Sequence, residues 1–555
     1  MRDGSAFEQT RCDEVRTTNS RNIVIFCGNG APPSTAEAVE AIADAHPDWR
    51  ILIVQGAGRR KRAWPYVKGK VRRLRREPVS YPLELLCKFM GKIHLARRHH
   101  VGGNVVLPQL CDFDRRNVSY YTADCIHEEE VLKAVREFRP WLAISLGAPI
   151  LKPCLFQIPE LGTINVHKSY LPDYRGMPPG FWELYDGTDG TGVSIHWVAK
   201  GLDTGEIVEQ VHVAIPPYTM PGGIGPQLDE AAIPLLLSVL TQLDSGKLPR
   251  VAQGQPETPT RSRPPSILSH RVRRRLASKR SPILGLHGWV RRLAKACLQA
   301  AYVHLWARIR NLYRRFRGTA HVTFLLYHRV DDSYLDDVTV GIDQFRNQVR
   351  LLRDHYDVLD MEEFLGAAHR ARKRPAVVIT FDDGYESAHL AARLLRRERL
   401  PATFFICTRI VGSDAAFPHD TQKLGRRVPA LSWDQIQEIS RWGFHIGVHT
   451  ASHANIAKIP FEEAKVEIET AINDAIDRLG HKGPETWFAY PHGKRDDITP
   501  EVRAALPELG VRYCFSAYGG INAPHFDALD IRRQGVDWKY SLLALRAVAE
   551  GWRVR

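Results

Sequence analysis

Two kinds of apolar spacing alternate along the first part of the chain. Short, mostly apolar runs at 22–28, 49–54 and 141–146 have the length of strands buried on both faces. Between them, apolar residues recur every three or four positions at 35–45 and 128–138, which is the period of an amphipathic helix. Strand, helix and strand in succession predict an α/β domain built on a doubly wound parallel sheet.

The alternation stops in a basic segment. Between Thr258 and Val330 there are seventeen Lys or Arg residues and no Asp or Glu, and this segment accounts for a net charge of +15 over 555 residues. We therefore divide the chain into a disordered segment at 1–20, a domain at 21–260, a basic linker at 261–318 and a domain at 319–555. A chain of this length predicts several domains.

The two halves of the linker differ. The first half, to about Pro282, is rich in Pro, Ser and Arg and is expected to be unstructured. The second half, Trp289–Phe316, has helical period. Its apolar positions fall near one predicted face: Val290, Leu293, Cys297, Ala301, Leu305, Ile309, Leu312 and Phe316.

A basic amphipathic helix is typical of a membrane-surface element. We expect peripheral contact with anionic lipid at the inner face of the membrane. The alternatives are a helix packed against a domain and a nucleic-acid-binding helix, although no recognition module supports specific nucleic-acid binding. A second basic run, Arg59–Arg76, is either a solvated surface or a clamp for a phosphorylated or membrane-held substrate.

Cysteine usage and hydropathy favour a cytoplasmic protein. The nine cysteines are scattered without a Cys-x-x-Cys pair, which fits a reducing compartment. Residues 1–20 lack the apolar core of a signal peptide, and no apolar run approaches the ~18 residues of a membrane span.

The first candidate site begins at Asn165 and His167. Strand alternation places the carboxamide and the imidazole on one face, and Asp203 follows another strand-like run at 193–198. Together they suit acyl transfer to an amine. Asn165 would donate to the oxyanion, His167 would move the proton of the amine, and Asp203 would orient His167 and raise its pKa. The alternative is an ordinary strand end.

These residues resemble the formyltransferase family that uses 10-formyltetrahydrofolate. The matching motifs are Asn165-x-His167-x-Ser169-x-Leu171-Pro172, Tyr174-Arg175-Gly176 and Leu202-Asp203-Thr204-Gly205. The resemblance implies a Rossmann-like arrangement with 10-formyltetrahydrofolate bound at the carboxyl ends of the strands. The aminoacyl-tRNA branch of this family carries a small C-terminal barrel, and the linker occupies its place here.

The second candidate site lies where later predicted strands end. Asp382 and Asp383 follow the run at 377–381, and His449 and His453 follow the run at 444–448. One carboxylate and two imidazoles form a ligand set for a divalent ion, and the neighbouring carboxylate is free to act as a base. The alternative is a surface carboxylate pair with ordinary strand-end histidines.

This second set resembles the polysaccharide deacetylase family, also called the NodB-homology domain. The matching motifs are Thr380-Phe-Asp-Asp-Gly384 and His449-Thr-x-x-His453. The resemblance implies a distorted (β/α) barrel of about seven strands. It also implies that Asp383, His449 and His453 hold the metal, expected to be zinc, and that Asp382 is the base.

The chain departs from the deacetylase pattern in two motifs. The Arg-x-Pro-Tyr motif is replaced by Phe488-Ala-Tyr-Pro-His-Gly493, and the late Leu-x-His motif, which supplies the general acid, has no match. His525 stands in the wrong context. His328 is a candidate substitute because it also ends a predicted strand.

Together, the two resemblances predict a bifunctional enzyme acting on an amino sugar that is nucleotide- or lipid-linked. One site transfers a formyl group to an amine, and the other hydrolyses an N-acetyl or N-formyl group. The order of the two steps stays open. The alternatives are an aminoacyl-tRNA formyltransferase-like activity and a membrane-associated scaffold with a decayed deacetylase site.

Overall fold

The computed structural model describes most of the chain in two compact units. The described residues are 21–28, 34–56, 117–176, 178–257, 260–262, 264, 266–280, 286–317, 321–366, 375–424, 426–480, 487–523 and 525–552. Unit 1 contains Met1–Ile215 and Gly225–Val272, and unit 2 contains Pro216–Ile224 and Arg273–Arg555. The predictions for residues 1–20 and Arg59–Arg76 concern segments outside the described residues.

Unit 1 is built on a seven-stranded sheet with the order β3-β2-β1-β4-β5-β6-β7. The strands are β1 (Asn22–Gly28), β2 (Arg50–Gly56), β3 (Val118–Ala123), β4 (Leu142–Leu146), β5 (Thr163–His167), β6 (Gly190–Trp197) and β7 (Ile207–Ala214). The pairings from β3 to β5 are parallel, whereas β6 and β7 are added antiparallel. This confirms the predicted Rossmann-like sheet.

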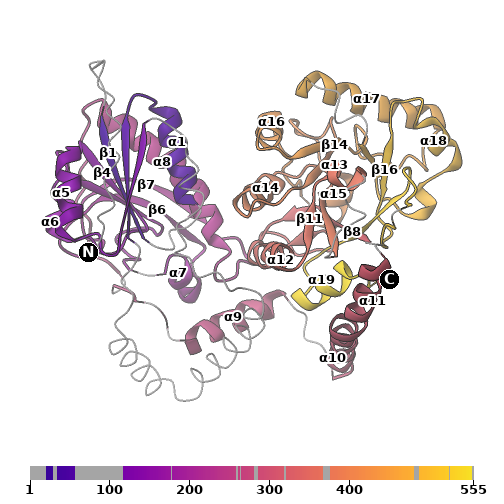
Figure 1. The fold of residues 1–555 in the computed structure, drawn as a ribbon, viewed down its shortest axis with the longest axis horizontal. Helices are drawn as coiled ribbons and strands as arrows, with labels where there is room; N and C mark the ends of the chain where they lie inside the picture. The colour runs from indigo at the N-terminus through magenta and orange to yellow at the C-terminus, as the bar shows by residue number, and fades with distance from the viewer. Residues whose placement is uncertain are drawn as a thin grey trace, which may run out of the picture. The chain divides into compact units, whose positions relative to one another are not determined.

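Helices cover both faces of this sheet (Figure 1). They are α1 (Ser34–Ala45), α5 (Glu129–Phe138), α6 (Pro153–Phe156), α7 (Phe181–Asp186) and α8 (Ile224–Asp244). The strand order reverses direction after β3, so right-handed crossovers place α1 and α5 on opposite faces. The reversal opens a crevice beyond the carboxyl ends of β1 and β4, where such sheets bind ligands.

Unit 2 is built on a closed ring of seven parallel strands. In ring order they are β12 (Ala376–Phe381), β13 (Thr403–Ile406), β14 (His445–Val448), β15 (Trp487–Ala489), β16 (Tyr513–Ser516), β17 (Ile531–Gly535) and β8 (Val322–Tyr327). The ring closes because β8 pairs with both β17 and β12. This confirms the predicted barrel. Three short strands lie outside the ring: β11 (Asp357–Leu359), which pairs with β12, and the pair β9 (Arg329–Val330) and β10 (Thr339–Val340).

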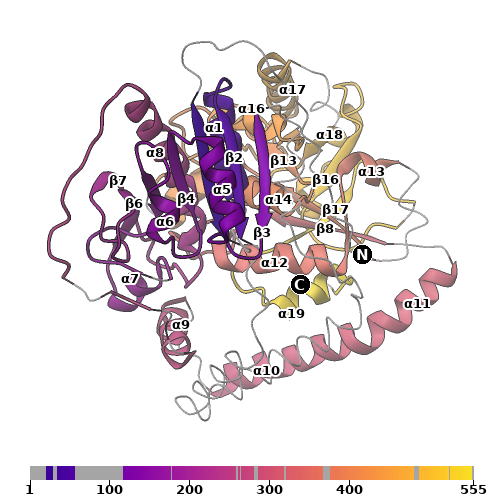
Figure 2. The ribbon, with the colours of Figure 1, turned by 60° about the vertical axis from the view of Figure 1, so that its left-hand side comes forward.

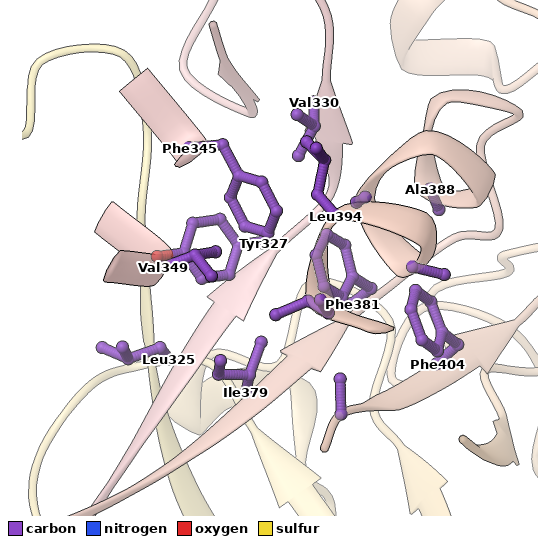
Figure 3. Packing of buried hydrophobic residues seen from close by; sticks show 14 of the residues in the cluster. Leu325, Tyr327, Val330, Phe345, Val349, Ile379, Phe381, Ala388, Leu394 and Phe404 are labelled. Carbon is purple, nitrogen blue, oxygen red and sulfur yellow. The ribbon is translucent and has the colours of Figure 1, made fainter. Parts of the chain in front are cut away.

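Helices surround this ring (Figure 1). They are α12 (Ile342–His355), α13 (Met361–Leu365), α14 (Ser387–Arg397), α15 (Pro418–Leu424), α16 (Trp433–Arg441), α17 (Phe461–Leu479), α18 (Pro500–Ala505) and α19 (Leu542–Ala549). Figure 3 shows how stacked aromatic rings fill the space under α12 and α14. Phe381 stacks on Tyr327 and on Phe404 at centroid distances of 5.5 and 4.8 Å. Phe345 packs edge-on against the rings of Phe381 and Tyr327.

The linker is more ordered than its sequence predicts. The expectation of an unstructured segment to about Pro282 is wrong, because α9 (Ser266–Arg280) is helical and buries Val272 and Leu276, one turn apart on one face. The predicted second helix is present as α10 (Leu286–Ala301), a π-helical turn η1 (Tyr302–Trp306) and α11 (Ala307–Arg317). Figure 2 shows these three segments as one extended rod. Among the described helices, none is long and apolar enough to cross a membrane.

Candidate active sites

The first site forms where β5 and β6 lie side by side in unit 1. Asn165 stands directly opposite His196 in the antiparallel register, and His167 follows Asn165 on the same face of β5. Asp203 reaches both imidazoles from the loop after β6: its oxygens lie 3.7 Å from Nδ1 of His167 and 3.7 Å from Nε2 of His196. The structure therefore brings together Asn165, His167 and Asp203, which the sequence singled out, and adds His196.

Hydrogen bonds fix the tautomer of each imidazole. His196 Nδ1 lies 2.9 Å from the carbonyl of Trp197 and donates to it, so its neutral ring accepts at Nε2 from the Asn165 amide at 3.1 Å. His167 Nε2 donates to the carbonyl of Tyr174 at 2.8 Å. The Nδ1 atom of His167, beside Asp203, is therefore the position where this ring gains or loses a proton.

Burial and charge set the protonation of this pair. Burial lowers the pKa of His167, and the upward effects of Asp203 and the Tyr174 carbonyl do not offset it. Burial raises the pKa of Asp203, but His196, His167 and the amide of Gly176, which donates to Asp203 at 3.0 Å, outweigh burial and lower it. A neutral imidazole thus faces an ionised carboxylate at neutral pH.

The sequence predicts that Asp203 raises the pKa of His167 and orients its ring, and the structure agrees with the first expectation but not with the second. The effect of Asp203 on that pKa is upward, but desolvation of the nearly buried ring is larger, so the net shift is downward. The ring is held by its hydrogen bond to Tyr174, because Asp203 lies beyond hydrogen-bond distance.

A cavity of about 580 Å³ opens beside these residues. Asn165, His167 and Asp203 lie on its wall together with apolar residues that include Leu146, Pro149, Ile150 and Val198. Lys168 and Asp229, which form an ion pair, also line it. An apolar cavity of this volume with convergent polar groups suits a small-molecule ligand.

The second site forms at the carboxyl ends of β12 and β14 in unit 2. Asp382 and Asp383 directly follow β12, and His449 directly follows β14. Asp383 Oδ1 lies 3.4 Å from Nε2 of His449 and 3.2 Å from Nε2 of His453. Among the described residues, Asp383, His449 and His453 form the one cluster whose ligand atoms lie close enough to hold a metal ion.

The donor set of this cluster fits a divalent cation. His449 Nδ1 donates to the carbonyl of Ala489 at 2.7 Å, which leaves the Nε2 lone pair facing Asp383. Asp383 Oδ1 is buried and makes no hydrogen bond to the described residues. A buried carboxylate oxygen without a hydrogen-bond donor, facing two imidazole nitrogens, suits a divalent metal ion.

Unusual backbone conformations occur at both sites. Seven described residues other than glycine have positive φ, and five of them are site residues or their neighbours: Asp203, Asp383, Thr450, His453 and His492. Such conformations cost roughly 1–3 kcal/mol each and persist where the surrounding structure imposes them. The local strain therefore coincides with the two clusters.

Arg533 is a further site residue that the sequence did not single out. Its guanidinium donates to both oxygens of Asp382, at 2.6 and 2.7 Å, and its side chain is fully buried against the rings of Phe405 and Phe515. The clamp holds the carboxylate plane of Asp382 in one orientation. Within the strand Ile531–Gly535, Arg533 occupies a position that the structure buries, and an arginine in a strand was the available signal.

Several further imidazoles surround the second site. His328 directly follows β8, and burial lowers its pKa against the upward effects of Asp383 and Asp382, so the predicted substitute acid does lie at this site. His419 and His492, which the sequence did not single out, have ring centroids 5.3 and 5.1 Å from that of His453. The exposed His525 is not among these contacts.

Comparison with known families matches both parts of the chain. Residues 93–240 match the family model described as Formyl transferase, and residues 369–514 match the model described as Polysaccharide deacetylase. The chain is 36% identical over 130 residues to the methionyl-tRNA formyltransferase of Syntrophomonas wolfei subsp. wolfei, a match that covers 23% of this chain and 41% of that protein. The chain thus spans less than half the length of this relative.

Two solved structures illustrate the similarity of each unit. IcaB from Ammonifex degensii aligns with a TM-score of 0.34 and 24% identity, over 42% of this chain and 97% of that chain. The formyltransferase PseJ from Anoxybacillus kamchatkensis aligns with a TM-score of 0.23 and 26% identity, over 26% of this chain and 74% of that chain. On the two family matches, the chain joins a formyltransferase domain at residues 93–240 to a polysaccharide deacetylase domain at residues 369–514.

Proposed function

We propose that the chain is a bifunctional enzyme acting on an amino sugar. The deacetylase domain would remove an N-acyl group, and the formyltransferase domain would formylate an amine. The observation that carries this proposal is that one chain holds both residue clusters, and the product of amide hydrolysis is the nucleophile of formyl transfer. The reverse order, in which a formyl group is added and later removed, uses the same two sites.

In the formyl-transfer step, an amine of the sugar attacks the formyl carbon of 10-formyltetrahydrofolate in the 580 Å³ cavity. Asn165 has a second amide hydrogen beside the one it gives to His196, which would stabilise the oxyanion. His167 would take the proton of the amine at Nδ1 and return it to N10 as the formyl C–N10 bond breaks and tetrahydrofolate leaves, while the ionised Asp203 would stabilise the imidazolium between these steps.

In the hydrolytic step, Asp383, His449 and His453 would hold a divalent ion, with zinc as the proposed metal. When bound, such an ion lowers the pKa of coordinated water toward neutrality. Asp382, fixed by Arg533, would accept the proton of the attacking water. His328, His419 and His492 are the candidate imidazoles for protonating the departing amine.

The proposed substrate is an amino sugar or N-acetylamino sugar carried on a nucleotide or a lipid. Because 10-formyltetrahydrofolate is a cytoplasmic donor, we propose that both sites work in the cytoplasm. A lipid-carried sugar would bring the protein to the inner face of the membrane, where the basic linker would meet anionic lipid.

Mass spectrometry tests this proposal directly. The purified chain is incubated with zinc, 10-formyltetrahydrofolate and a panel of amino and N-acetylamino sugars, free, nucleotide-linked and lipid-linked. Loss of an acetyl mass followed by gain of a formyl mass on one sugar is the expected result. Formyl gain without acetyl loss would mean that the deacetylase acts on another substrate or at a later step, as in the reverse order. No mass change on any free, nucleotide-linked or lipid-linked sugar would contradict the proposal.

A second candidate is formylation of an aminoacyl-tRNA. The observation that favours it is the similarity of residues in the first domain to methionyl-tRNA formyltransferases. Against it, the described residues that follow α8 form helices α9, α10 and α11 in place of the small barrel expected for that branch. Incubation with charged initiator tRNA and the formyl donor distinguishes the two substrates.

A further inference from the structure

The linker helix exposes an apolar face. Six large apolar side chains on α10, η1 and α11 have exposed fractions between 55% and 65%: Leu298, Leu305, Trp306, Ile309, Leu312 and Tyr313. Positions 305, 309 and 312 follow the i, i+4, i+7 spacing of one helical face, with 306 and 313 beside it. These six residues are called the exposed linker face below.

The opposite side of the same helix packs against α19 within unit 2. Val303 and Ala307 are buried there, and α10 and η1 contact α19. Tyr302 donates to the carbonyl of Glu550 at 2.9 Å, and Arg310 forms an ion pair with the Glu550 carboxylate at 3.0 Å. The helix is therefore held by one side, and its exposed linker face points away from the contacts that fix it.

The apolar face that the sequence predicts is the exposed one, because its described residues are all exposed: Cys297, Ala301, Leu305, Ile309 and Leu312. A second side of the helix, centred on Val303 and Ala307, is buried. The apolar side chains of the helix thus serve two surfaces, and only one of them is covered by the described part of unit 2.

Charge identifies the occupant of the exposed linker face. Lys295 and Arg308 are exposed on either side of it, and the sequence of the same helix adds arginines at 291, 292, 314, 315 and 317. No acidic residue occurs between Thr258 and Val330. An apolar stripe bordered by cations, in a segment whose own sequence has no acidic residue, is complementary to a bilayer with negative headgroups.

We propose that the exposed linker face docks on an anionic lipid surface, with Leu305, Trp306 and Ile309 entering the headgroup–acyl boundary. The helix would lie in the plane of the interface and hold the barrel of unit 2 beside the membrane. This inference deepens the proposed function, because it specifies the surface through which a lipid-carried substrate would be reached. It does not depend on either reaction.

Vesicle co-sedimentation of the full chain tests the docking. The vesicles are phosphatidylcholine alone, or phosphatidylcholine with about a quarter phosphatidylglycerol. The test variant combines Trp306→Ala with Ile309→Ser, and the matched control is Val466→Ser on α17, whose exposed fraction of 56% equals that of the replaced residues within a few per cent. A second variant, Lys295→Gln with Arg308→Gln, removes charge only.

The expected result is selective binding to the anionic vesicles. The Trp306/Ile309 variant should bind at least about tenfold more weakly, the charge variant should lose its preference for anionic vesicles, and Val466→Ser should bind as the unsubstituted chain does. Equal binding of the Trp306/Ile309 variant would overturn the proposal. Two other results would also overturn the proposal. One is a dimer of the unsubstituted chain that becomes a monomer in the Trp306/Ile309 variant, and the other is binding of the unsubstituted chain to RNA in preference to vesicles.

Formyl transfer to a water-soluble amino sugar is measured on the same variants. Because none of the substituted residues lines either site, activity should be retained while vesicle binding is lost. Vesicle binding without any enzymatic activity would leave the docking inference intact and would contradict the proposed function. The two claims therefore fail separately.

Discussion

Asp203→Asn isolates the electrostatic part of the formyl-transfer site. The asparagine amide oxygen can keep accepting from Gly176, and its NH₂ group can face the unprotonated Nε2 of His196, so the local geometry is retained while one negative charge is removed. Two consequences follow for His167. Its protonated form loses its stabilising anion, and its pKa loses an upward contribution.

The magnitude follows from the 3.7 Å separation between Asp203 and His167 Nδ1. Both side chains are mostly buried. Two unit charges at that distance attract by about 4 kcal/mol at an effective dielectric constant of about 20. Losing that attraction when His167 becomes charged corresponds to a fall in kcat of up to about a thousandfold.

The direction in which Asp203→Asn shifts the pH dependence of kcat follows from the pKa of His167. His167 must be neutral to accept the proton, so activity falls as the pH drops through its pKa. Burial already lowers that pKa, and removing Asp203 lowers it further. The acid limb of kcat should therefore move to lower pH while the plateau falls.

The assay is the initial rate of tetrahydrofolate release at saturating amine, measured across pH. Asp189→Asn, an exposed aspartate in the turn before β6, is the matched control and should leave the profile unchanged. An acid limb that moves to higher pH, or a plateau that is unchanged in Asp203→Asn, would refute the assignment of Asp203 as the partner of His167.

Three further predictions concern unit 2. A chelator, or Asp383→Asn, should abolish deacetylation and leave formyl transfer unchanged, with bound zinc measured by elemental analysis. Arg533→Met should lower the free energy of unfolding by about 3–5 kcal/mol in urea titration, because Asp382 is left buried and unpaired, and should abolish deacetylation. Phe345→Ala should cost about 3–5 kcal/mol, because it removes a fully buried ring from the aromatic stack.

Each of these predictions has a matched control. Added zinc should restore deacetylation after chelation but not in Asp383→Asn; a chelator-resistant deacetylase would contradict the metal site. Arg533→Lys keeps the charge but not the two-point contact, so its loss of stability should be intermediate. Val466→Ala on α17 removes exposed rather than buried carbon and should change stability by less than about 0.5 kcal/mol.

The parts of the site predicted from the sequence are those governed by local rules. Asn165 and His167 share a face because side chains alternate along a strand, and Asp383 and His449 follow strands whose carboxyl ends meet in a parallel ring. His196 was harder to assign, because its role depends on the register between β5 and β6. Arg533 could not be placed, because it meets Asp382 across 151 residues of sequence.

Similar reasoning explains the outcome for the fold. The parallel sheet and the barrel were predictable from buried runs alternating with helical periods. The helix α9 was not, since its many arginines and flanking prolines resemble a loop, and what stabilises it is the burial of Val272 and Leu276. The exposed side of the linker helix follows from helical spacing, whereas its buried side at Val303 and Ala307 could not be predicted, because that burial depends on tertiary packing.

The closure of the barrel makes the deacetylase site dependent on the order of synthesis. All the motif residues through His453 leave the ribosome before β17, yet Asp382 is clamped only when β17 inserts between β16 and β8 and delivers Arg533. Until then, Asp382 of a newly made chain lacks its counter-ion and β8 has an open sheet edge. Hydrolytic activity would therefore report on completed assembly of the ring, whereas unit 1 contains no residue beyond Val272.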